Sequence, residues 1–268
     1  MKTLKPGIGF HISVSPNKDG KMIAHRIRHQ VDGIPKFLYF LLFGFASFCM
    51  SIFANLAFAG LDEAESAMRR GDYETAIQEF SKLSEGGDLC MKYNLGTAHT
   101  FNAGKTNNLD EYLRGMNLIS EVATERGKCQ GHAQYVIGLE FDQAKKYKKA
   151  IPWYRRAAEN KLPIAIFNLG MMYFNGDGVE ENWPIAFEWL HKAAMCGYPA
   201  SQFMVGLMYG RGQGVSENMF KAHKWMIIAA RNGNKKAKEA VIMNERMLNP
   251  FVIFTGKGMA SAFSIDCE

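Results

Sequence analysis

The sequence predicts an all-α fold, an α/α solenoid of about five two-helix repeats that follows an N-terminal signal or anchor segment. Three observations predict it. Residues 163–198 and 199–234 match at 15 of 36 positions without a gap, and a period of this length is typical of stacked two-helix units. Apolar residues recur at helical spacing within each unit. An uncharged apolar run at 37–59 precedes the repeats.

Residues 1–36 are predicted to be a disordered basic region, with seven Lys and Arg residues. Met22 is an alternative start, because the residues before it resemble neither a helix nor a signal. The 23 uncharged residues at 37–59 end in Ala57 and Ala59 before Gly60, the small-x-small pattern of a signal peptidase site. A run of this length also suffices for an uncleaved transmembrane anchor.

The basic flank predicts that the repeats lie outside the cytoplasm. The expected location is therefore the periplasm or the medium after cleavage, or the inner membrane if residues 37–59 stay as an anchor. The repeat array is predicted at 60–248 and a C-terminal tail at 249–268. The tail has a short apolar run of strand-like residues, and we expect it either to cap the last repeat or to be loose.

Each repeat is predicted to contain two facing helices. Their apolar stripes are Ala165, Leu169 and Tyr173 in the first helix, and Ala186, Trp189 and Ala193 in the second. Paired glycines between the helices, Gly176 and Gly178 in one copy, allow the positive φ that closes a helix.

Gly170 and Gly206 fall in the middle of the first helices, where glycine costs about 1 kcal/mol relative to alanine. We therefore predict that the facing helix approaches closely there, with small residues interlocking with Trp189 and Tyr173.

The segments LGMMYFNGDGV with AFEWLHKAA, and VGLMYGRGQGV with AHKWMIIAA, resemble the Sel1-like repeat (SLR) family, relatives of the tetratricopeptide repeats. Residues 132–162 and 89–127 keep part of the pattern, and 62–85 are closer to a plain tetratricopeptide unit. The resemblance covers about 190 residues in roughly five units. It implies a superhelical array that binds other proteins as an adaptor or scaffold.

Charge and motifs exclude several functions. The pI near 9 comes from residues 1–59, because the remainder has 25 basic against 24 acidic residues. Nucleic acid is therefore not expected as a partner. No HExxH, GxSxG, GxxxxGK[ST] or CxxC motif occurs, and the histidines are expected to be solvated or at edges rather than ligands. We predict no catalysis, no cofactor and no metal.

One local basic run surrounds Tyr147. A solvated turn is the simpler interpretation and a patch for anionic lipid or an acidic partner the alternative. The run consists of Lys145, Lys146, Lys148 and Lys149.

Four cysteines follow residue 59, and export permits disulfides between them. Cys90 near the start of one helix and Cys129 just past the end of its antiparallel partner are expected to be neighbours. Cys196 is then left for Cys267 in the tail. Buried free thiols are the alternative.

The first helices are apolar nearly all round, which predicts either contact between successive first helices or a concave binding face. The candidate partner-binding residues are Tyr135, Leu139, Phe167, Met171, Phe203 and Leu207.

The sequence thus predicts an exported protein-binding scaffold, with the partner and the oligomeric state left open. Two alternatives remain. One is a cell-wall or carbohydrate-binding protein or weak hydrolase. The other is an assembly factor anchored in the inner membrane, whose only membrane contact is residues 37–59.

Overall fold

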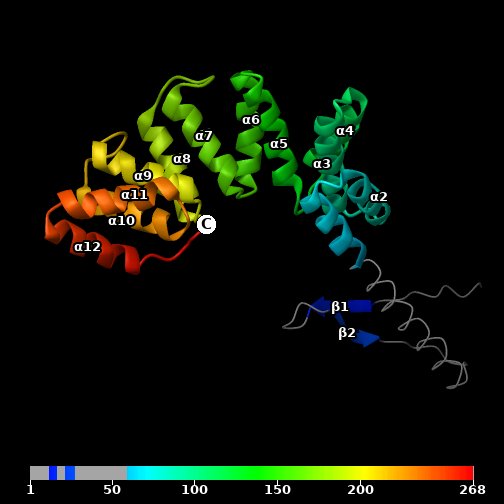
Figure 1. Ribbon diagram of the computed structural model, residues 1–268, viewed down its shortest axis with the longest axis horizontal. Coiled ribbons are helices and arrows are strands. Elements are labelled where there is room, and N and C mark those ends of the chain that lie inside the picture. Colours follow the sequence, from blue (N-terminus) through cyan, green and yellow to red (C-terminus); the bar gives the residue numbers. More distant parts are fainter. Residues whose placement is uncertain (1–11, 17–21, 28–58, 268) are drawn as a thin grey trace, which may run out of the picture. The chain divides into compact units, whose positions relative to one another are not determined.

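The computed structural model describes residues 12–16, 22–27 and 59–267 of the chain (Figure 1). The chain divides into two units, Met1–Leu56 and Ala57–Glu268. The first unit contains two antiparallel strands, β1 (Ile12–Pro16) and β2 (Met22–Ile27). The sequence predicted no ordered element there. Residues 37–58 of the predicted signal or anchor, Ala57 among them, lie outside the described residues, whereas Ala59 and Gly60 begin a helix over 59–70.

The second unit is a series of helical hairpins, as predicted. Each helix from α2 to α11 packs against the next along the chain, and α12 returns to pack against α10 (Figure 1). Among the described residues, none of the helices combines the length and the apolar character needed to cross a membrane. The pairs are 59–70 with α2 (Tyr73–Ser84), α3 (Leu89–Thr106) with α4 (Leu109–Thr124), α5 (Gln130–Gln143) with α6 (Tyr147–Glu159), α7 (Pro163–Asn175) with α8 (Trp183–Met195), and α9 (Pro199–Arg211) with α10 (Met219–Arg231).

Two further helices follow the pairs, α11 (Lys235–Met247) and α12 (Pro250–Ser261). The tail, for which the sequence left a cap or a loose end open, is helical over α12 despite its strand-like residues, and it packs against α10. Pro250 occupies the first turn, and the Asn249 side chain accepts a hydrogen bond from the backbone N of Phe251 at 2.8 Å. Both features favour the start of a helix.

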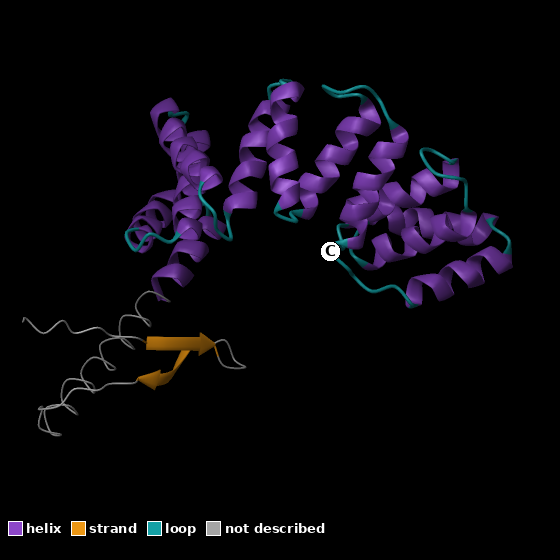
Figure 2. Cartoon of the chain, turned by 180° about the vertical axis from the view of Figure 1, so that it is seen from behind, coloured by secondary structure: helices purple, strands orange, loops and turns teal. Residues whose placement is uncertain are grey.

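Each long loop within the last two pairs begins at a glycine that ends one helix and finishes at an asparagine that caps the next (Figure 2). Gly176 ends α7 with a φ of 76°, a left-handed conformation that glycine adopts without a Cβ clash. Asn182 then caps α8, its side chain accepting from the backbone N of Ile185 at 3.0 Å. Gly212 and Asn218 repeat this arrangement around the next loop.

Paired helices approach closely where the first helix has its mid-helix glycine, as predicted. A Cβ added to Gly170 would lie 2.8 Å from Cγ of Leu190. The equivalent positions are Gly138 against Tyr154 at 2.7 Å and Gly206 against Met226 at 3.1 Å. The residue expected to fill this space, Trp189, is only half-buried, whereas Leu190 is fully buried. Ala186 and Ala193 of the predicted stripe are fully buried, so only its large residue is wrong, by one position or about 100° around the helix.

Successive units are joined through the second glycine of each loop. A Cβ on Gly178 would lie 2.7 Å from Cβ of Tyr147, the first residue of α6. A Cβ on Gly214 would clash with the backbone carbonyl of Trp183, the first residue of α8. Each loop therefore rests on the start of the preceding second helix, and a side chain would separate the two units.

Buried amide side chains connect the units a second time. Gln202 of α9 is fully buried, and its Nε2 donates to the carbonyl of Ala194 in α8 at 3.1 Å. Asn232 donates in turn to Oε1 of Gln202 at 2.9 Å. Gln134 and Asn160 make the same pair earlier in the array.

The unit between these two has a different pair of residues. Ile166 and Cys196 stand where the neighbouring repeats have Gln and Asn. Ile166 is fully buried, and Cys196 forms a disulfide with Cys267. Cys90 is joined to Cys129. These are the two pairings that the sequence favoured.

Replacing Gly170 by alanine should lower the free energy of unfolding by about 1–2 kcal/mol, because overpacking against Leu190 outweighs the better helix propensity of alanine. Urea titration followed by circular dichroism measures the change. Gly104→Ala in α3 is the matched control, since a Cβ there meets nothing within 4 Å. It should stabilise the chain slightly, and equal effects of the two substitutions would contradict the close approach.

Gly214→Ala should destabilise the array more than Gly233→Ala. Both glycines have positive φ, 69° and 93°, so both substitutions cost about 1–2 kcal/mol in backbone strain. Only Gly214 also touches the preceding unit, whereas a Cβ on Gly233 meets nothing within 4 Å. The difference between the two urea midpoints therefore isolates the contact between units. No difference would show that the loop does not join them.

Candidate protein-binding surface

The six residues predicted to bind a partner are all half-buried. Phe167 packs with its ring 5.2 Å from that of Tyr198, the residue before α9, and Met171 packs against the same core cluster as Phe167. Tyr135 lies 5.8 Å from the ring of Tyr154 in another cluster. The apolar side of these first helices thus contributes to packing within and between units. Leu139, Phe203 and Leu207 are half-buried as well.

Large apolar side chains are instead exposed on the helices that follow the repeats. Met247 and Phe254 are each 78% exposed, and Phe251 is 66% exposed. We call the exposed apolar set of α11 and α12 the terminal surface: Ile242, Met243, Met247, Phe251 and Phe254. A smaller set, Phe101, Leu109 and Leu113, is exposed on α3 and α4.

The terminal surface arises because α11 and α12 bury mainly small residues. Ala237 is the buried residue of α11, and Gly256 and Ala260 are those of α12. Both helices pack against α10, and they contact each other much less than each contacts α10. Since the small residues face α10, the large ones remain on the outside. The sequence signal was the apolar run of the tail, whose strand-like residues did not indicate a helix.

The two helices of the terminal surface have an excess of positive charge. The two helices have five basic residues, Lys235, Lys236, Lys238, Arg246 and Lys257, against two acidic ones, Glu239 and Glu245. Glu245 pairs with Lys257 at 2.8 Å, which lowers the pKa of that carboxyl. The remaining charge favours a partner with acidic groups around an apolar segment.

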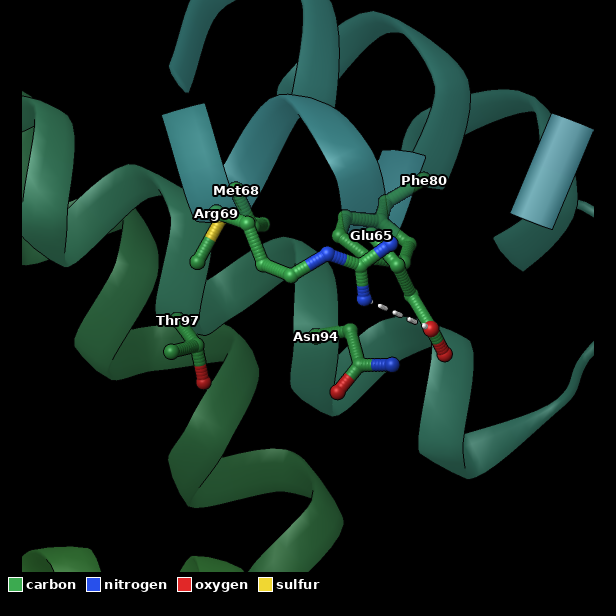
Figure 3. Close-up of a pocket in the computed structure, with 6 residues that line it drawn as sticks. All are labelled: Glu65, Met68, Arg69, Phe80, Asn94 and Thr97. Atoms are coloured by element: carbon green, nitrogen blue, oxygen red, sulfur yellow. Dashed lines mark ion pairs between the residues drawn. The ribbon is translucent and has the colours of Figure 1, made fainter. Parts of the chain in front are cut away.

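A recess of about 270 Å³ lies at the other end of the array, between the helix over 59–70, α2 and α3 (Figure 3). Arg69 and Glu65 form an exposed ion pair of 3.5 Å beside it. Asn94 and Thr97 of α3 add polar groups, whereas Phe80 supplies a buried apolar wall. These groups can accept and donate hydrogen bonds, but they hold no pair of a nucleophile and a base. Across the part of the chain that the structure describes, three or more His, Cys, Asp or Glu residues never gather as a metal site would require.

The lysine run spans the turn between α5 and α6, with Lys145 and Lys146, and the first turn of α6, with Lys148 and Lys149. Its four lysines are exposed, and Lys145 takes a φ of 55° in this turn, which is shorter than the later ones. Tyr147 is half-buried beneath the following loop, at the contact with Gly178.

Within residues 59–267, the histidines do not gather at one site. His99 lies 2.8 Å from Glu111, and His191 packs between the rings of Phe187 and Trp225, where burial lowers its pKa. The expectation of solvated or edge histidines is wrong for His223, which is fully buried and has no hydrogen-bond partner on either ring nitrogen. Burial lowers the pKa of His223 too.

The hairpin repeat, its two glycines per loop and its buried alanines agree with the sequence resemblance. The family model described as Sel1 repeat matches residues 131–162, 163–198 and 199–234. The chain contains three Sel1 repeats. They are the pairs α5 with α6, α7 with α8 and α9 with α10. Sel1 repeats generally mediate protein–protein interaction.

Solved structures with the same fold agree. A protective antigen of uropathogenic Escherichia coli that displays an SLR fold is 25% identical, with a TM-score of 0.60 over 69% of this chain and 40% of that one. This chain therefore spans less than half the length of the antigen. A Sel1 repeat protein from Oxalobacter formigenes is 20% identical, with a TM-score of 0.58 over 75% of this chain and 83% of that one. No match was found among curated proteins.

Proposed function

We propose that this chain is an exported scaffold or adaptor that binds other proteins through the surface of its Sel1 solenoid, without catalysis. The terminal surface carries the proposal. Its phenylalanines present large apolar area at low entropic cost. Its methionines adapt to irregular partners. Buried apolar anchors of this kind dominate the affinity of protein interfaces.

Export is supported by the cysteines. Cys90 with Cys129, and Cys196 with Cys267, form disulfides within the described residues. Such bonds persist in oxidising compartments and are rare in the cytosol. We therefore propose that the repeats work in the periplasm or outside the cell, after cleavage before Gly60. Tethering by residues 37–59 is the alternative arrangement.

The predicted face around Phe167 and Phe203 remains a second proposed surface. Its residues are half-buried, so a partner there gains less newly buried apolar area than on the terminal surface. We expect it to contribute less to affinity.

The terminal surface is tested with the full chain as bait in a crosslinking pull-down from envelope extract. Met243→Gln, Met247→Gln and Phe254→Gln together should reduce capture of the bound protein at least tenfold, since losing interface anchors costs about 1–2 kcal/mol each. Quantitative mass spectrometry of the captured proteins measures the loss.

Two further baits serve as comparisons. Leu109→Gln with Leu113→Gln removes exposed apolar residues of α4 and should leave capture unchanged. Phe203→Gln with Leu207→Gln tests the predicted face. Circular dichroism shows that each bait is folded. Equal capture by all baits would reject the terminal surface, and recovery of glycan alone would favour the cell-wall alternative.

A further inference from the structure

His223 lies in the interface between α10 and α12. Its side chain is completely inaccessible to solvent. The backbone of α12 covers it, because a Cβ added to Gly256 would lie 2.8 Å from Cδ2 of the imidazole. Neither Nδ1 nor Nε2 has a hydrogen-bond partner. The ring is therefore held as a neutral group in an apolar site.

A proton on this ring is incompatible with the packing around it. The imidazolium has two N–H donors and a positive charge, and burying an unpaired charge is far more costly than burying a neutral ring. Two charged groups act on His223, Glu245 from α11 and Lys257 from α12, and their effects on its pKa are opposite. They are paired to each other, so the effect of Glu245 on the imidazolium is opposed by that of Lys257. Arg211, the only charged residue of α9, has no effect on its pKa.

The helix that covers His223 has few fully buried side chains. Of its residues, only Gly256 and Ala260 are buried. It is retained by Arg231, whose Nη1 donates to the carbonyl of Ala260 at 3.2 Å, and by edge-on contact between the rings of Phe220 and Phe251. The exposed ion pair between Lys257 and Glu245 adds a link to α11. A segment with so few buried contacts opens locally before the whole fold does.

The chain on both sides of α12 stays attached. The segment after α12 is fixed by the disulfide between Cys196 and Cys267 and by the backbone N of Asp266, which donates to Met195 at 3.0 Å. Residues 248–249 join its start to α11. If α12 leaves α10, it remains a closed loop that can dock again.

We propose that α12 is an acid-sensitive strap, which docks on α10 while His223 is neutral and lifts off when the imidazole takes up a proton. Lifting exposes the face of α10 around His223 and moves Phe251 and Phe254. The strap would thus regulate the terminal surface, a consequence that rests on the proposed function. The lifting of α12 itself does not depend on that function.

The sign follows from the proton balance. Burial lowers the pKa of His223 in the docked state below the usual value of about 6.5, which it regains when α12 is undocked. The undocked state therefore binds more protons, so docking is strongest above about pH 6.5 and weakens as the pH falls below it. The weakening reaches about tenfold per pH unit.

Hydrogen exchange read by mass spectrometry on the full, disulfide-intact chain tests the strap without any partner. Protection factors of α12 amides, corrected for the intrinsic pH dependence of exchange, should fall about tenfold from pH 7.5 to pH 5.5. Those of α5 should not change. In His223→Leu the protection of α12 should be equal at both pH values. Equal protection at both pH values in the wild type, or the same fall in the leucine variant, would overturn the proposal.

A second pair of variants is independent of histidine titration. Gly256→Ala places a methyl group against the imidazole and should give α12 at pH 7.5 the low protection that the wild type has at pH 5.5. Gly258→Ala, where a Cβ meets nothing within 4 Å, should leave α12 protected. Full protection in Gly256→Ala would show that α12 is not seated on His223. A negative pull-down would affect only the proposed function.

Discussion

The contact between a mid-helix glycine and the facing helix is the constraint on which the array depends. A glycine recurs at this point in three first helices, at positions 138, 170 and 206. The side chain that packs against it differs and is Tyr154, Leu190 or Met226 respectively. The distance between paired helices is therefore set by the residue that lacks a side chain, and the partner can vary in shape. The loop glycines, typified by Gly214 against Trp183, apply the same rule between units. These glycines set the distance between the two helices of a hairpin and the distance between successive hairpins. Hairpins whose buried side chains differ can therefore stack in the same way.

A disulfide replaces an amide contact in the middle repeat. Gln202 bonds to the preceding unit and to Asn232 of its own, whereas the middle repeat has Ile166 and Cys196 at these positions, and its cysteine is bonded to Cys267. The disulfide thus occupies a position that an amide bridge fills in the neighbouring repeats. Its consequence is at the end of the array, because it returns the segment after α12 to α8 and holds α12 close to α10.

Periodicity and glycine placement were enough to predict the hairpins, the close approach at Gly170 and the pairing of Cys90 with Cys129. They could not show which neighbour a side chain meets. Leu190 rather than Trp189 fills the space at Gly170, since a stripe read from spacing is uncertain by one position around the helix. Strand-like residues of the tail, such as Val252 and Ile253, gave no sign of a helix, and the cap of Asn249 outweighs their preference. The candidate surface and the burial of His223 both follow from that helix, so neither could be predicted.

The second helices of the repeats bury more of their side chains than α12 does. Second helices of the repeats bury a row of alanines with a large residue among them, as Leu190 lies between Ala186 and Ala193, whereas α12 buries only Gly256 and Ala260. Elements with little buried area open most readily, and side chains left outside are those a partner can reach. The repeats therefore supply a rigid support, and the mobile, adaptable contacts belong to the end of the array. A buried histidine without partners is tolerated at this boundary because the helix above it can leave, whereas inside a repeat the same imidazolium would have to remain buried.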